Sequence, residues 1–282
     1  MTPFFSVVIP TYNRAHTIKR AVFSVLQQDY QNFDLWIVDD GTVDETKKII
    51  SAAQSLHPHR INYLKTPRRG VSAARNLGVA QSEGDWIAFL DSDDEWKKNK
   101  LSLQANFIQE NPHIQLVHGE EIWMKNHQRI NPRKKHQKHG GFIFQKCLAL
   151  CLISPSTVVL KRELFEKTGG FNPDFPVCED YDLWLRITRE YETGFIEKPV
   201  TIKHGGHPDQ LSKKYKAMDY WRVLSLFNIL KSENLSEEDR KAVCKQIMLK
   251  TEILLNGYRK HHNMKNHHQI EKIRNEIQPM SQ

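Results

Sequence analysis

Three carboxylates stand within four residues of one another at Asp91-Ser92-Asp93-Asp94. Carboxylates packed this closely repel one another, so a cation or several hydrogen-bond donors must neutralise them. Mg²⁺ and Mn²⁺ prefer carboxylate oxygens and keep coordination positions for phosphate oxygens. The cluster therefore predicts a divalent metal site for a phosphate-containing ligand. The alternative is a helix N-terminus, where acidic side chains are also favoured.

A second acidic pair, Asp39-Asp40, precedes the turn residue Gly41. Its carboxylates could accept hydrogen bonds from a nucleotide base or from ribose hydroxyls. They could equally begin a turn, because aspartate side chains bond readily to nearby backbone.

The segment 67–78 places Arg68, Arg69 and Arg75 around a glycine turn and a predicted helix start. Arginines and a helix N-terminus together suit phosphate groups. A loop with solvated arginines is the alternative. The segment lacks the glycine spacing of a Walker loop.

These residues must be positioned by the elements around them. In the first half of the chain, short apolar runs alternate with helical periodicity, which predicts a parallel sheet flanked by helices. Strands are expected over 4–9, 35–38, 61–64 and 86–90. Helices are expected over the stretch containing Ile18 to Leu26, after a capping box from Thr42 to Glu45, and after Ser72 as the cap of a short helix through Gly78. Because ligands bind beyond the carboxyl ends of parallel strands, both acidic clusters should face one crevice.

The second half is less regular. We expect a helix over 97–111, a strand over 115–118, a basic loop over 131–141, a strand over 157–160 and a helix over 179–191. From residue 217 onward only helical periodicity remains, which predicts a helical C-terminal appendage. The whole is an α/β chain, divided into regions 1–117, 118–212 and 213–282.

Composition limits the partners and the compartment. The chain has 282 residues and a formal net charge of +8, which suits anionic ligands. Its four cysteines form no C-x-x-C pair, which predicts reduced thiols in a cytosolic compartment. Residues 1–10 lack the pattern of a signal peptide and no later apolar run approaches about 20 residues, so we expect neither secretion nor a membrane span. The helix near 220–230 follows basic residues, so peripheral contact with the inner membrane face is an alternative to packing on its own domain.

Four short runs, in this order, carry a resemblance to a known family. They are Ser6-Val-Val-Ile-Pro-Thr-Tyr-Asn-Arg14, Ile37-Val-Asp-Asp-Gly41, Gly70-Val-Ser-Ala-Ala-Arg-Asn76 and Phe89-Leu-Asp-Ser-Asp-Asp94. Together they closely resemble family 2 glycosyltransferases, which implies a GT-A fold with a Rossmann-like sheet. The resemblance covers roughly residues 4–210 and fades in the tail.

The resemblance assigns roles to individual positions. It implies that region 1–117 binds the nucleotide sugar, that Asp40 holds the base and that Arg75 approaches the diphosphate. Asp91 and Asp93 stand where the family has its D-x-D motif, and the additional Asp94 leaves open which of the last two touches the metal. The implied nucleotide-binding set is Pro10, Thr11, Tyr12, Arg14, Asp39, Asp40, Arg75, Asp91 and Ser92.

The segment 178–186, reading C-E-D-Y-D-L-W-L-R, resembles the family's E-D motif. This implies that Asp180 is the general base, that Glu179 orients the acceptor and that region 118–212 is catalytic. We expect Asp182 to be a solvated helix residue. Either His204 or His207 would cover the donor and join Asp91, Asp93 and Asp94 at the metal.

The expected function is transfer of a sugar from a nucleoside diphosphate, most simply UDP, to an acceptor hydroxyl with inversion. Mn²⁺ or Mg²⁺ would assist, and the acceptor would be a glycan or a lipid-linked glycan of bacterial surface polysaccharide synthesis. A sugar-phosphate nucleotidyltransferase is a rival, although residues 10–14 lack the glycine-rich loop such enzymes carry. A nucleic-acid-binding module is another, but it leaves the acidic residues unexplained, so we expect no nucleic-acid partner.

Overall fold

The computed structural model describes residues 2–126, 128–206, 215–231, 235–262 and 264–281. The strands are β1 (Phe5–Thr11), β2 (Phe33–Asp39), β3 (Ile61–Lys65), β4 (Trp86–Phe89), β5 (Glu95–Trp96), β6 (Leu116–Lys125), β7 (Gln128–Ile130), β8 (Val159–Lys161) and β9 (Gly194–Gly205). The α-helices are α1 (Ile18–Leu26), α2 (Thr46–Leu56), α3 (Val71–Gln81), α4 (Lys100–Glu110), α5 (Phe144–Cys147), α6 (Arg162–Lys167), α7 (Glu179–Thr188), α9 (Asp219–Leu230), α10 (Glu237–Lys260) and α11 (His267–Ile277). Short 3₁₀ turns are η1 (Lys134–His136), η2 (Pro155–Thr157) and η3 (Gln278–Ser281).

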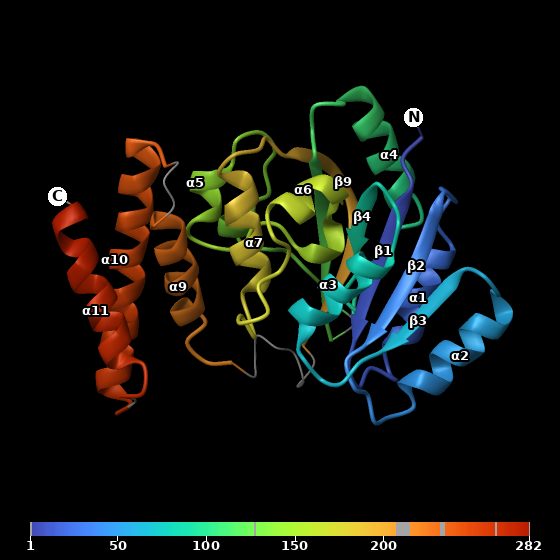
Figure 1. The fold of residues 1–282 in the computed structure, drawn as a ribbon, viewed down its shortest axis with the longest axis horizontal. Coiled ribbons are helices and arrows are strands. Elements are labelled where there is room, and N and C mark those ends of the chain that lie inside the picture. Colours follow the sequence, from blue (N-terminus) through green and yellow to red (C-terminus); the bar gives the residue numbers. More distant parts are fainter. Residues whose placement is uncertain (1, 127, 207–214, 232–234, 263, 282) are drawn as a thin grey trace.

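The strands form one mixed sheet in the order β3-β2-β1-β4-β8-β6-β9-β5, with β7 paired to β6. Strands β1 to β4 are parallel, β8 is antiparallel to its neighbours, and β6 runs parallel to β9. Helices cover both faces of this sheet (Figure 1). The predicted α/β fold, a largely parallel sheet flanked by helices, is confirmed.

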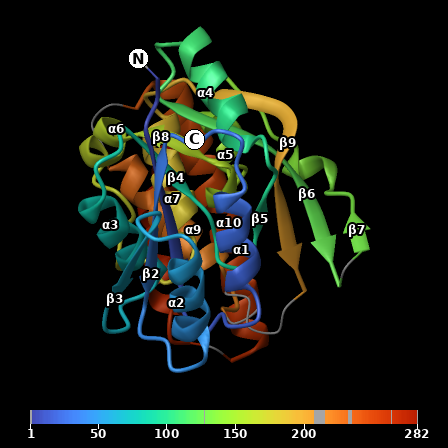
Figure 2. The ribbon, with the colours of Figure 1, turned by 90° about the vertical axis from the view of Figure 1, so that its right-hand side faces the viewer.

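Alternation along each strand divides the core in two, because successive strand side chains point to opposite faces. Val7 and Ile9 of β1 pack with residues of α1, α2 and α4, while Val8 packs with residues of α3 and α7 on the other face. Figure 2 shows α1 and α2 in front of the parallel strands. Because β1, β2 and β4 are parallel, their carboxyl ends share one edge of the sheet.

The predicted C-terminal helices are present as α9, α10 and α11, which lie side by side at one end of the molecule (Figure 1). Their apolar residues join the same core as α7, and Ser225 of α9 donates to Asp182 of α7 at 2.9 Å. Within the described ranges, no helix has the length and apolar character that a membrane span requires. The division at 117/118 and 212/213 stays a prediction.

Both predicted helix caps are wrong. The helix after Thr42 begins only at Thr46, and the Thr42 hydroxyl instead accepts from the backbone N–H of Asn13 at 3.0 Å. Ser72 lies inside α3, whose N-cap is Gly70 at φ 95°, and its hydroxyl donates to the Phe175 carbonyl. In both cases a contact from a distant part of the chain replaces the local cap.

Two element lengths also differ from expectation. The strand expected over 115–118 extends as β6 to Lys125, because it pairs along its length with β9 through two register shifts. The helix expected to reach residue 191 ends at Thr188. The long β6 and β9 carry the second half of the chain toward the acidic edge of the sheet.

Candidate active site

The four residues Asp91 to Asp94 form a turn directly after β4, closed by a hydrogen bond from the Asp94 N–H to the Asp91 carbonyl. Asp91 accepts from Arg75 at 2.6 Å. Asp94 is 2% exposed and accepts from the Ser156 hydroxyl at 2.7 Å and from the His204 N–H at 3.0 Å. The Asp94 carboxylate thus fastens the turn to η2 and β9, and Ser92 beside it is buried.

Asp93 has a different environment. Burial and the neighbouring charge of Asp91 raise its pKa, and the nearby Arg14 cation opposes that rise. Burial and the charge of Asp93 raise the pKa of Asp94 as well. Carboxylates that raise one another's pKa favour a bound cation, and an all-oxygen donor pair fits Mg²⁺ or Mn²⁺. Because both Asp94 carboxylate oxygens already accept hydrogen bonds from Ser156 and His204, Asp91 and Asp93 suit the ion better than Asp94. The ligand set stays a prediction.

Within the described part of the chain, no three His, Cys, Asp or Glu side chains gather as a metal-binding group. Two protein carboxylates at the acidic turn leave the other coordination positions for ligand oxygens, as is common for Mg²⁺. The His204 ring lies 3.3 Å from Glu95, next to this turn. His207 falls outside the described residues.

Arg75 joins the acidic turn to the second half of the chain. Its guanidinium, 3% exposed, donates to Asp91 at 2.6 Å and to Glu179 at 2.7 Å. Arg75 lies in the second turn of helix α3, which begins at Val71 after the N-cap Gly70. Arg75 was expected to approach a diphosphate, and that role stays a prediction. What the structure adds is a buried bridge between two carboxylates more than 80 residues apart.

Glu179 and Asp180 open helix α7, after Cys178 in the left-handed conformation at φ 61°. Burial raises the pKa of Glu179 to about 7; the charge of Arg75 opposes this shift and that of Asp180 adds to it. Asp180 accepts from its neighbour's N–H at 2.7 Å and from the Cys151 thiol at 3.4 Å. The two acidic side chains are therefore held differently, Glu179 by Arg75 and Asp180 beside Cys151.

Asp182 is not the solvated residue expected. It is buried, pairs with Arg186 at 2.8 Å and accepts from Ser225 at 2.9 Å. Its carboxylate fastens α7 to α9, which is a structural role that spacing on one helix does not reveal.

Lys203 of β9 is a site residue that sequence reasoning missed. Its ammonium donates to the Ser154 hydroxyl at 3.1 Å. Burial opposes its charge, but the carboxylates of Glu121, Asp94, Asp91 and Asp180 outweigh that effect and raise its pKa. One cation therefore interacts with acids from β4, β6 and α7. In the sequence, the signal that could have indicated Lys203 is its position next to His204, a candidate metal ligand.

The nucleotide side of the site lies at the ends of β1 and β2. Asp40 accepts from the N–H groups of Arg69 and Gly70 at 2.6 and 2.9 Å. Asp39 accepts from the Thr42 N–H and from the Tyr63 hydroxyl. Both aspartates thus shape loops around the predicted base pocket. Direct contact of either with a base stays a prediction.

Further residues of the predicted nucleotide set surround these loops. Pro10 and Thr11 are buried at the end of β1, and the Arg14 N–H donates to Thr46 at 2.9 Å. The Arg68 guanidinium lies 4.0 Å from the centre of the Tyr12 ring and donates to its hydroxyl. Loops from both acidic strand ends and from α3 therefore lie at one edge of the sheet, and that they enclose a single crevice stays a prediction.

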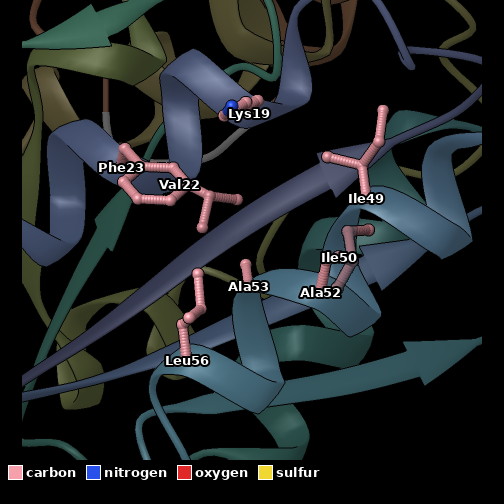
Figure 3. Close-up of a pocket in the computed structure, with 8 residues that line it drawn as sticks. All are labelled: Lys19, Val22, Phe23, Ile49, Ile50, Ala52, Ala53 and Leu56. Carbon is pink, nitrogen blue, oxygen red and sulfur yellow. The ribbon is translucent and has the colours of Figure 1, made fainter.

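A separate apolar groove lies between α1 and α2 (Figure 3). Val22 and Phe23 of α1 face Ile49, Ala53 and Leu56 of α2 across it, and Lys19 is its charged lining residue. This groove offers no carboxylate, so it is unrelated to the candidate active site.

Two tryptophans, one in β5 and one in β6, have different environments. Trp96 is buried and donates its indole N–H to the Ser156 carbonyl, so it belongs to the core. Trp123 is partly exposed on β6 and donates to Glu121 at 2.7 Å.

Comparison with known proteins agrees with this geometry. Residues 6–169 match the model described as Glycosyl transferase family 2. The chain is 35% identical over 202 residues to an uncharacterized glycosyltransferase of Rickettsia felis, covering 70% of this chain and 32% of that protein. It thus spans about a third of the length of this relative and of a second one from Rickettsia conorii. It is also 35% identical over 229 residues to the Escherichia coli UDP-Glc:alpha-D-GlcNAc-diphosphoundecaprenol beta-1,3-glucosyltransferase WfgD, covering 79% of this chain and 85% of that protein.

Solved structures show the same fold. S. aureus TarS in complex with UDP-GlcNAc superposes with a TM-score of 0.77 at 19% identity, covering 97% of this chain and 80% of that one. The mannosyltransferase PcManGT from Pyrobaculum calidifontis, in complex with GDP-Man and Mn2+, superposes with a TM-score of 0.61 at 17% identity. The match covers 98% of this chain and 85% of that one. The GT-A architecture expected from the sequence is confirmed. With its matching motifs, its relatives and this fold, the chain belongs to glycosyltransferase family 2.

Proposed function

We propose that this glycosyltransferase moves a sugar from a UDP-sugar, with inversion, onto a hydroxyl of a lipid-diphosphate-linked glycan in surface polysaccharide synthesis. WfgD, which is named for a UDP-glucose donor and a diphosphoundecaprenol acceptor, supports this class of donor and acceptor. The observation that carries the proposal is the Arg75 bridge, because it holds the acidic turn opposite the start of α7.

Donor binding falls to the first half of the chain. The loops fastened by Asp39 and Asp40 frame the base, with Tyr12 and Arg68 beside them. Asp91 and Asp93 would hold Mn²⁺ or Mg²⁺, with His204 nearby. When bound, the ion offsets the charge that develops on the diphosphate leaving group.

Acceptor activation falls to Asp180. A carboxylate at a helix N-terminus can take the proton of a hydroxyl as its oxygen attacks the anomeric carbon. The Asp180 Oδ2 accepts from the Cys151 thiol at 3.4 Å, and the charge of Lys203 interacts with this carboxylate. Glu179, held by Arg75, would orient the acceptor sugar.

The test is transfer from UDP-glucose and UDP-GlcNAc to a synthetic GlcNAc α-diphosphate carrying a short alkyl chain. We expect transfer that EDTA abolishes and Mn²⁺ or Mg²⁺ restores, and a β-linked product from the α-linked donor by NMR. Undiminished transfer in chelator would remove the ion from the proposal. An α-linked product would remove the inverting role of Asp180.

Location at the inner face of the cell membrane follows from the proposed lipid-linked acceptor. The chain would act as a peripheral protein of the cytoplasm, with no nucleic-acid partner. Fractionation of cells producing the full-length protein tests this placement.

A further inference from the structure

The segment from Ile122 to Lys146 contains no aspartate or glutamate. Basic residues accumulate within it, namely Lys125, Arg129, Arg133, Lys134, Lys135, Lys138 and Lys146. This run includes the loop that the sequence singled out as basic, and neither the donor site nor the proposed general base uses it. A concentration of one charge sign raises the local concentration of ligands of the opposite sign.

Part of this segment forms a pocket. One wall is Trp123 of β6, and the other comes from the end of β7 and the segment through the turn η1. The lining residues there are Ile130, Asn131, Pro132, Arg133, Lys135 and His136. The Trp123 and His136 rings lie 5.1 Å apart at an angle of 54°. The pocket therefore combines an aromatic wall with two cationic side chains.

The cations at the rim are available to a ligand. Arg133 and Lys135 are exposed, and among the described residues neither pairs with a carboxylate. Glu121, which accepts from the Trp123 indole, is buried and is already paired with Lys138 at 3.4 Å. Burial and the charges of Lys135, Lys138, Lys203 and Arg133 lower the pKa of His136, which is a sign of uncompensated positive charge here.

The pocket also lies close to the proposed chemistry. Trp123 is the register partner of Lys203 in the pairing of β6 with β9, and adjacent strands are about 4.8 Å apart. Lys203 in turn interacts with Asp91, Asp94 and Asp180. A ligand group in the pocket would therefore lie beside the strand whose Lys203 interacts with Asp180, the proposed base.

We propose that this pocket is the acceptor's phosphate subsite, in which Arg133 and Lys135 bind the diphosphate of a lipid-linked acceptor while its sugar reaches Asp180. The inference rests on the proposed function and extends it to how the acceptor is recognised. Arginine offers a fork of donors that matches phosphate oxygens, and lysine adds a point charge. A pocket with an aromatic wall suits a discrete phosphate ester better than it suits a flat membrane surface.

Binding is measured first, so that the outcome does not depend on turnover. With UDP and Mn²⁺ saturating the donor site, calorimetry compares the GlcNAc α-diphosphate alkyl ester with the uncharged alkyl glycoside of GlcNAc. We expect Arg133→Ala with Lys135→Ala to weaken binding of the diphosphate about 10- to 100-fold, the loss associated with charged hydrogen bonds. Binding of the neutral glycoside should not change.

Lys134→Ala is the matched control, because Lys134 is exposed in the same turn but does not line the pocket. We expect it to change diphosphate binding less than about twofold, as is usual for a surface charge. In transfer assays the double variant should raise the acceptor KM by the same factor as the binding loss, with kcat and the donor KM unchanged.

Unchanged diphosphate binding in the double variant would overturn the subsite, and so would an equal loss in Lys134→Ala. Loss of binding to phosphatidylglycerol vesicles, with diphosphate binding intact, would make the segment a membrane contact instead. A protein that binds UDP and the diphosphate through Arg133 and Lys135 but transfers no sugar would contradict the proposed function and leave the subsite standing.

Discussion

At the level of single residues, the acids of the site differ in the partners that hold them. Arg75 pairs with Asp91 and Glu179, while Asp94 is held by Ser156 and the backbone of β9. Such partners fix where a carboxylate points and how readily it ionises. Chemically similar side chains can therefore have different roles within a few ångströms of one another.

Asp180→Asn tests the base. Because asparagine keeps the shape but cannot accept a proton, we expect kcat to fall about 10²- to 10⁴-fold. UDP binding measured by calorimetry should be unchanged. Asp174→Asn, an exposed acid in the loop before α7, is the control and should retain full activity. Near-normal transfer by the Asp180 variant would refute the assignment.

Glu179→Gln tests the pH dependence of stability. The folded chain loses the Glu179 proton near pH 7, whereas the unfolded chain loses it near its ordinary value of 4.5. Between these values the folded state binds more protons, so this group's stabilising contribution is complete below about pH 4.5 and is lost as the pH rises through 7. In urea unfolding, the free energy of unfolding should fall less between pH 5 and pH 8 for the Gln variant than for the unmodified protein. The difference should be at most about 1.4 kcal/mol per pH unit. Parallel pH profiles for both proteins would contradict this.

At the level of elements, close packing of α3 on the sheet positions Arg75. Gly78 allows it, because an added Cβ would lie 2.5 Å from Val8 Cγ1 and 3.1 Å from Val38 Cγ2. The helix therefore lies directly against β1 and β2, the strands whose ends form the nucleotide loops. A small shift of α3 would move the guanidinium away from Asp91 and Glu179.

Gly78→Ala should destabilise the protein by about 1–3 kcal/mol, the usual cost of overpacking a core. Gly257→Ala in α10 is the matched control, because an added Cβ there meets no atom within 4 Å. Replacing that helical glycine should stabilise the fold by about 0.5–1 kcal/mol. Chemical denaturation measures both, and equal effects would contradict the packing argument.

At the level of the whole molecule, the C-terminal helices complete a core that begins in the first strands. Val223, Leu226 and Val243 are fully buried in the same cluster as Val8 and Phe89. Lys250 of α10 also donates to the Ala149 carbonyl at 2.9 Å. The appendage therefore stabilises the face of the sheet from which α7 presents Asp180.

Deleting residues 213–282 should remove cooperative unfolding, because large apolar side chains of α7 and the sheet would be exposed to water. Near-UV circular dichroism and thermal melts of the shortened chain measure this. A truncated protein that melts cooperatively, within a few degrees of the full chain, would show that the tail is an independent unit.

The sequence by itself determined the strand ends and hence the edge at which the chemistry is gathered. Apolar runs mark β1, β2 and β4, and parallel pairing obliges Asp39, Asp40 and the acidic turn to share one edge. Only tertiary structure decided that Asp94 is fastened to Ser156, that Arg75 bridges to Glu179 and that Lys203 lies among the acids. Ser156 is 62 residues from Asp94, and Glu179 is 104 residues from Arg75. Local periodicity carries information about neighbours within a few residues only.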